Sequence, residues 1–176
     1  MVAPRRKAAG KSQASGTPAV GEDVLELLAE DHRKVSELFE EYEASRDDAG
    51  EEDKVYRVAT ICLELIVHSA VEEEIFYPAA RDALGADAEI LNQAEVEHAS
   101  LKYLIGELGD MQPSDPLYDA HVKVLFEYVK HHVEEEEGEI FPALRDSDLD
   151  LEGLGREVAS RKQELQDEYQ AEEASD

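Results

Sequence analysis

The sequence predicts an all-α fold, namely an up-down-up-down four-helix bundle made of two helical-hairpin repeats, with a short extra helix at the C-terminal end. From Glu22 onward apolar residues recur at helical spacing, and the breaks between these periodic segments are short. No alternating run rich in Val, Ile and Thr indicates a strand. Because isolated amphipathic helices are marginally stable in water, we expect these helices to bury their apolar faces against one another.

The first predicted hairpin spans residues 22–84. Its first helix, 22–44, has a stripe that contains Leu25, Leu28, His32, Val35 and Phe39. Its second helix, 51–76, carries a stripe of Val58, Ile61, Leu65, His68, Glu72 and Ile75. Pro78 follows this stripe, and since proline disrupts a helix interior, we expect a kink or restart there and a short turn up to Leu84.

The second predicted hairpin begins after Gly85-Ala86-Asp87, which has the composition of a helix break followed by an N-cap. Its first helix, 88–108, has a stripe of Leu91, Ala94, His98, Leu101 and Ile105. After a loop at 109–115, Ser114 or Asp115 is expected to cap the next helix, with Pro116 in its first turn. That helix runs to about residue 140, close to Pro142, and a final amphipathic helix covers 150–168.

These elements predict one bundle domain at 22–168, preceded by a disordered tail at 1–21 and followed by a frayed tail at 169–176. Cys62 is the single cysteine, which excludes an intramolecular disulfide and a cysteine-rich zinc site. The chain has no apolar run long enough to span a membrane, and its basic start lacks the apolar segment of a signal peptide. We therefore expect a cytoplasmic protein.

The composition is strongly acidic, with 44 Asp and Glu residues against 17 Lys and Arg and a formal net charge of −27. Binding to nucleic acid requires clustered basic residues, and anionic membrane surfaces also attract basic segments. The charge balance therefore argues against both partners and is typical of a protein that can hold cations.

The two predicted hairpins resemble each other in sequence. "EDHRKVSELFEEY" aligns with "VEHASLKYLIGEL" at an offset of 66 residues, which places His32 on His98. "HSAVEEEIFYPAAR" aligns with "HVEEEEGEIFPALR" at an offset of 64 residues. The second alignment places His68 on His132 and Glu72 on Glu136. Each half thus has a lone histidine on its first helix and a His-x-x-x-Glu pair on its second.

The adjacent histidines His131 and His132 both stand four residues before a glutamate, so the local spacing alone does not choose between them. The repeat does, because counting back from Pro142 matches only His132 and Glu136 to the pair that precedes Pro78. His131 lies about 100° away around the helix, toward the flank.

The pattern predicts a metal site. Residues four apart on a helix share a face, and a buried glutamate is costly unless a cation pairs with it. Four imidazoles and two carboxylates are too many for one tetrahedral zinc ion, but they suit two ions, each held by two histidines and bridged by two glutamates. Mixed nitrogen and oxygen donors favour iron or manganese over calcium, and an oxo or hydroxo bridge would lower the remaining charge. The predicted ligands are His32, His68, Glu72, His98, His132 and Glu136. We interpret the neighbouring acidic residues as solvated or flanking charges: Glu73, Glu74, Glu134, Glu135 and Glu137.

The arrangement H…HxxxE…H…HxxxE, together with the segments "EEIFYP" and "EGEIFP", resembles the hemerythrin-like, HHE cation-binding family over residues 22–145. "LGREVASRKQEL" is similar to the trailing helix of that family. The resemblance implies a four-helix bundle with a non-haem di-iron centre that handles O2 or related small oxidants.

Two departures from the oxygen-carrying hemerythrins count against reversible O2 carriage. Those carriers have a fifth histidine four residues after the histidine of the third helix, where this chain has Lys102. Their last-helix carboxylate is an aspartate five residues after its histidine; here Glu136 lies four residues after His132, and Glu137 lies five after it. Tyr128 and Glu64 stand one turn before the paired histidines and could reach the metal, although roles behind the ligands or in the core are favoured.

The leading hypothesis is a di-iron protein whose partner is a small molecule, O2, peroxide or nitric oxide. It would handle or sense oxidative or nitrosative stress, and catalase-like decomposition of peroxide is one option, so the sequence leaves open whether it is an enzyme. The alternatives are an iron-binding or iron-sensing module without catalysis and a metal-free acidic interaction bundle.

Overall fold

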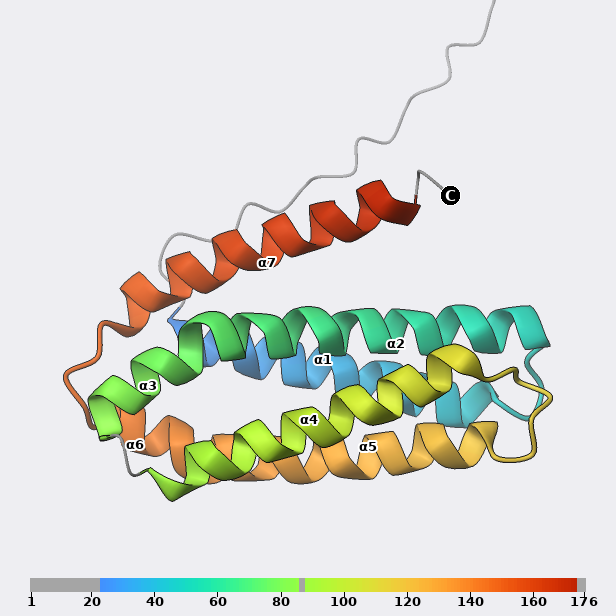
Figure 1. Cartoon of the computed structure of the whole chain (residues 1–176), viewed down its shortest axis with the longest axis horizontal. Coiled ribbons are helices and arrows are strands. Elements are labelled where there is room, and N and C mark those ends of the chain that lie inside the picture. Colours follow the sequence, from blue (N-terminus) through green and yellow to red (C-terminus); the bar gives the residue numbers. More distant parts are fainter. Residues whose placement is uncertain (1–22, 86–87, 174–176) are drawn as a thin grey trace, which may run out of the picture.

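The computed structural model describes residues 23–85 and 88–173, and it confirms an all-α fold whose helices pack as a bundle (Figure 1). Within these residues there are five long helices and no strand. Two of the five contain a short π-helical segment, so the elements in chain order are α1 (Val24–Ser45), α2 (Glu51–Val71), η1 (Glu72–Phe76), α3 (Tyr77–Leu84), α4 (Glu89–Asp110), α5 (Tyr118–Glu135), η2 (Glu136–Ile140), α6 (Phe141–Arg145) and α7 (Leu151–Glu173).

The helix ends differ from the prediction by a few residues. Asp23 caps α1 by accepting a hydrogen bond from the backbone N–H of Glu26 at 2.9 Å. The helix expected to begin at Pro116 begins at Tyr118, because Asp115 accepts from the backbone N–H of Gln112 at 2.7 Å and stabilises a turn instead. The final helix continues to Glu173. The predicted tail at 1–21 and the predicted cap at Asp87 lie outside the described residues.

The two prolines do not break their helices. Before each proline the helix widens into a π turn, in which the N–H of Tyr77 bonds to the carbonyl of Glu72 and the N–H of Phe141 bonds to that of Glu136. Each proline then stands near the start of the next α-helical segment, where its missing N–H costs little. The expected restart is therefore a π turn, and both π turns begin at a predicted glutamate ligand. Such turns occur frequently at functional sites.

The apolar core is divided into two clusters by a layer of polar side chains. Along α1 the first cluster ends at Leu28 and the second begins at Val35, with His32 between them. The first cluster includes Leu154, Val158 and Leu165 of α7, which packs against α1, α2 and η1 and not along α4 and α5 (Figure 1). None of the described helices is long and apolar enough to cross a membrane.

Candidate metal centre

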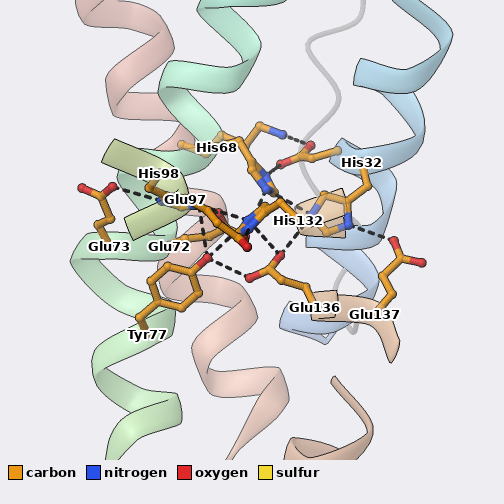
Figure 2. A network of polar contacts seen from close by, with 12 residues as sticks. His32, His68, Glu72, Glu73, Tyr77, Glu97, His98, His132, Glu136 and Glu137 are labelled. Atoms are coloured by element: carbon orange, nitrogen blue, oxygen red, sulfur yellow. Dashed lines mark hydrogen bonds and ion pairs between the residues drawn. The ribbon is translucent and has the colours of Figure 1, made fainter. Parts of the chain in front are cut away.

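The polar layer contains all six residues predicted as metal ligands, brought together from α1, α2, α4, α5 and the two π turns (Figure 2). None of the six is more than 6% exposed: His32, His68, Glu72, His98, His132 and Glu136. Four imidazoles and two carboxylates at this depth need compensation within the protein, because water cannot reach them.

The four histidines form two pairs that meet through their Nε2 atoms. The Nε2 atoms of His32 and His68 lie 3.1 Å apart. Those of His98 and His132 also lie 3.1 Å apart. Each pair joins the lone histidine of one hairpin to the His-x-x-x-Glu histidine of the same hairpin.

The two glutamates connect these pairs. Glu72 places Oε1 at 3.0 Å from His68 Nε2 and Oε2 at 3.3 Å from His98 Nε2. Glu136 places Oε2 at 3.3 Å from His32 Nε2 and at 3.7 Å from His132 Nε2. Both carboxylates therefore lie where each could bridge two cations, one beside each histidine pair.

The outer nitrogen of every histidine faces a carboxylate. The distances from Nδ1 to the nearest carboxylate oxygen are 2.8 Å for His32–Glu137, 3.5 Å for His68–Asp31, 3.0 Å for His98–Glu73 and 2.9 Å for His132–Glu97. Since a carboxylate accepts hydrogen bonds, these contacts favour a hydrogen on each Nδ1, and in the neutral imidazole this leaves the Nε2 lone pair facing inward. Such contacts are typical of metal-binding histidines.

These outer carboxylates correct the sequence prediction, which interpreted Glu73 and Glu137 as solvated or flanking. Although Glu73 is 34% and Glu137 is 44% exposed, the carboxylate of each contacts the Nδ1 atom of a buried histidine. The available signal was their position, because each directly follows a predicted ligand at the same place in the repeat. Asp31 and Glu97 likewise directly precede His32 and His98.

The donor set fits metal ions. Both carboxylate oxygens of Glu72 and Oε2 of Glu136 are buried and make no hydrogen bond. The Nε2 atoms of each histidine pair lie 3.1 Å apart, close enough for one cation to contact both. Such a cation would also satisfy the buried carboxylate oxygens. The residues are therefore consistent with a buried cation site.

The same groups attract protons when no cation compensates them. Burial opposes the charged form of His68, but the negative charges of Glu72 and Asp31 outweigh burial and raise its pKa to about 10. In the same way Glu136 and Glu137 raise the pKa of His32 against burial. Burial opposes the charged form of Glu72 too, yet His68 holds the pKa of that carboxyl well below its usual range. Cations and protons therefore compete for this centre.

Tyr77 is a member of the site that the sequence analysis missed. Its hydroxyl donates to Glu136 Oε1 at 2.9 Å and lies 3.1 Å from His98 Nε2 and 3.4 Å from His132 Nε2 (Figure 2). Burial, reinforced by the charge of Glu72, raises the pKa of this phenol far above its usual range, so it stays protonated. Phe141 holds the equivalent place in the other half and stacks on His32 with ring centroids 5.9 Å apart. This Tyr-for-Phe difference between the aligned repeats was the available signal.

Two residues that the sequence placed near the metal lie outside the centre. Tyr128 is 48% exposed, and Glu64 forms an ion pair with Lys34 at 2.6 Å. Each stands one turn before a ligand histidine, about 40° farther around the helix, and this rotation turns it toward the outside of the bundle. Glu136 is rotated by the same angle in the opposite sense from His132, which turns it inward.

Comparisons with known proteins identify the family of the chain and support its fold. The family model described as Hemerythrin HHE cation binding domain matches residues 23–144. A curated relative, a DNA nickase of Nostoc sp., is 28% identical over 144 residues, which are 80% of this chain and 38% of the relative. The chain thus spans well under half of that relative's length. A crystal structure of a hemerythrin HHE cation binding domain-containing protein from Mycobacterium kansasii superposes with a TM-score of 0.68 at 23% identity, covering 82% of this chain and 87% of that one. This last likeness shows the fold alone.

Proposed function

Because the chain belongs to the hemerythrin HHE cation-binding domain family, we propose that its buried centre holds two iron ions, with manganese as the alternative metal. His32 and His68 would hold one ion, and His98 and His132 the other. Glu72 and Glu136 would bridge them, and each hairpin of an up-down-up-down bundle would supply three ligands. The observation that carries this proposal is the set of buried carboxylate oxygens without a hydrogen bond, which face paired Nε2 atoms.

We further propose that the protein binds or reacts with O2, peroxide or nitric oxide, in the handling or sensing of oxidative or nitrosative stress. Two iron ions side by side supply Lewis acidity and one-electron redox steps toward such small ligands. The chain's own contribution is to exclude water, to fix the histidine rings through four outer carboxylates, and to present the Tyr77 hydroxyl near His98 and His132. Because that hydroxyl donates its one hydrogen to Glu136, its oxygen can accept a hydrogen bond from a protonated ligand such as H2O2.

Among these ligands we favour peroxide. The cavity beside the centre, which the four histidines line together with residues such as Val35 and Leu65, has a volume of about 10 Å³. A cavity of this size holds no more than one water molecule, so neither O2 nor H2O2 fits there without movement of the side chains. The preference for peroxide therefore rests on the Tyr77 hydroxyl, which favours a polar ligand.

The nicking activity in the name of the Nostoc relative is not part of this proposal. The chain covers 38% of that protein. Its 44 acidic residues against 17 basic ones oppose binding to the phosphates of DNA. In our proposal the partner is therefore a small molecule, and neither nucleic acid nor a membrane.

A second candidate is an iron-binding or iron-sensing module without catalysis. It is favoured by the burial of all six ligands, because a cation that binds only the folded chain adds its binding free energy to the stability of the fold. In that case iron occupancy itself would be the signal.

The test is anaerobic reconstitution of the full chain with Fe²⁺, followed by iron analysis and optical spectra before and after O2 and H2O2. We expect about two irons per chain, an oxygen-dependent absorption band in the near-ultraviolet to blue, and repeated consumption of added peroxide. Fewer than one iron per chain would overturn the dinuclear centre. Two bound irons per chain, with no reaction toward O2 or H2O2 beyond a single turnover, would support the iron-binding module without catalysis.

A further inference from the structure

A second group of metal-binding side chains lies on the surface beside the buried centre. It consists of Glu97 on α4 with His131 and Glu135 on α5, and one ligand atom from each lies within 4.8 Å of the others. His131 Nε2 is 3.4 Å from Glu135 Oε1 and 3.8 Å from Glu97 Oε1. His131 is 61% exposed, whereas the two carboxylates are 15% and 25% exposed, so the group is open on one side.

The same place in the first hairpin is built differently. Asp31 is the repeat equivalent of Glu97, and it pairs with the ammonium group of Lys162 from α7. The positions of His131 and Glu135 are taken there by Val67 and Val71, which are buried in the apolar cluster to which α7 contributes. In the first hairpin, therefore, a helix covers this face and brings a positive charge to the carboxylate.

In the second hairpin, neither a covering helix nor a lysine side chain of the described residues accompanies the equivalent group. Helix α7 packs against α1, α2 and η1, on the other side of the bundle from this group (Figure 1). In the part of the chain that the structure describes, neither Glu97 nor Glu135 forms an ion pair with lysine or arginine. The amide of Gln93 donates to both, at 3.0 Å and 2.7 Å, but it is neutral. Two neighbouring carboxylates thus lack the compensation that Lys162 gives to Asp31.

We propose that Glu97, His131 and Glu135 bind a divalent transition-metal cation in place of that ammonium group. One imidazole and two carboxylates are a donor set for Zn²⁺, Fe²⁺ or Mn²⁺, and three protein ligands leave open positions for water. The cation would balance the two negative charges at a point that solvent reaches directly.

This surface site is also the route by which the buried centre is loaded, a step that rests on the function proposed above. Glu97 belongs to both sites, since its Oε1 faces His131 and its Oε2 accepts from His132 Nδ1 at 2.9 Å. His132 is a ligand of the buried centre and His131 is its immediate neighbour in the chain. The Glu97 carboxylate and the His132 imidazole therefore lie between a cation at the surface site and the buried position.

The surface site is tested with Zn²⁺ by isothermal titration calorimetry on the iron-loaded chain at about 0.15 M salt, which screens diffuse binding to the acidic surface. We expect one Zn²⁺ beyond the buried ions. Since loss of a residue behind a metal ligand costs about 10- to 100-fold in affinity, loss of a ligand in His131→Ala or Glu135→Gln should weaken this binding at least tenfold. Glu134→Gln and His121→Ala are the matched controls and should bind as the parent chain does. Equal binding by His131→Ala and the parent would overturn the site.

The loading route is tested by the rate of Fe²⁺ uptake into the metal-free chain. We expect His131→Ala to slow uptake several-fold and to reach the parent's final iron content. Unchanged uptake would overturn the route. A reduced final iron content would show that His131 is a ligand of the buried centre and would overturn its assignment to the surface site.

His68→Ala separates the two proposals, because it removes a buried ligand and leaves the surface group intact. Loss of Zn²⁺ binding in His131→Ala but not in His68→Ala supports the surface site even if the buried centre holds no iron.

Discussion

Lys102 donates hydrogen bonds to both carboxylate oxygens of Glu73, at 2.7 and 2.5 Å, and so points away from the buried centre. Glu73 in turn faces His98 Nδ1 at 3.0 Å. Lys102 occupies the place where the oxygen-carrying hemerythrins have a fifth histidine ligand. In this chain the residue holds the carboxylate that faces His98, a proposed ligand, and adds no donor to the proposed metal centre.

Lys102→Ala should therefore weaken iron retention while leaving the helical fold intact. Without the ammonium group Glu73 can turn to solvent, and His98 loses the partner that fixes its ring. Loss of such a partner costs about 10-fold or more in metal affinity. Competition with an iron chelator measures the change, and Lys123→Ala, which removes an exposed lysine from α5, is the control. Equal retention by both variants would contradict the supporting role of Lys102.

His132→Ala should lose half or more of the bound iron, because it removes an inward donor of the buried centre. His131→Ala should keep the buried iron, since its ring is 61% exposed and directed at Glu97 and Glu135. Iron analysis after removal of weakly bound metal by a mild chelator gives the comparison. Equal losses in the two variants would refute the register obtained by counting back from the prolines.

Helical periodicity and the internal repeat were sufficient to predict the bundle and the convergence of the six residues. Spacing of three and four residues determines which side chains share a face, and Pro78 and Pro142 align the two halves. The π turns were not predictable in this way, because they add no residue type that differs from an ordinary helix. Their effect is local, so the predicted glutamates still reach the centre.

The support around the ligands was harder to predict. In the sequence, Glu73 and Glu137 belong to acidic runs. The packing of the helices in the structure shows that these carboxylates face histidines of other helices. Tyr77 stands beside apolar neighbours in "EEIFYP", but its alignment with Phe141 is a place beside the centre where the two halves differ in a polar atom. Such asymmetry between repeats is the signal to look for in related sequences.

Tyr77→Phe should destabilise the metal-free protein by about 1–3 kcal/mol, because Glu136 Oε1 would lose its donor while it stays buried. The iron content should remain that of the parent chain, since all six ligands are present. Urea unfolding of the metal-free chain measures the stability, and Tyr103→Phe is the control, as its side chain is 65% exposed. A change in unfolding free energy no larger than that of the control would exclude a structural role for the Tyr77 hydroxyl.

The stabilisation that bound iron gives to the protein should increase as the pH rises. In the metal-free chain the pKa of His68 is raised to about 10, against about 6.5 when unfolded. The folded state therefore binds the extra proton more tightly, and this stabilisation is complete below about pH 6.5 and is lost as the pH rises toward 10. Iron requires neutral imidazoles, so its binding releases protons and becomes more favourable over the same range.

We therefore expect the difference in melting temperature between iron-loaded and metal-free protein to widen from pH 6 to pH 9. Thermal unfolding of both forms under anaerobic conditions at several pH values measures this difference. In the metal-free chain, His68→Gln should flatten the fall in stability with rising pH, because it removes the group whose pKa is raised. His121→Ala, which alters a histidine that bonds only to the Leu117 carbonyl, should leave the slope unchanged. A difference that stays constant or narrows with rising pH would show that protons and cations do not compete at this centre.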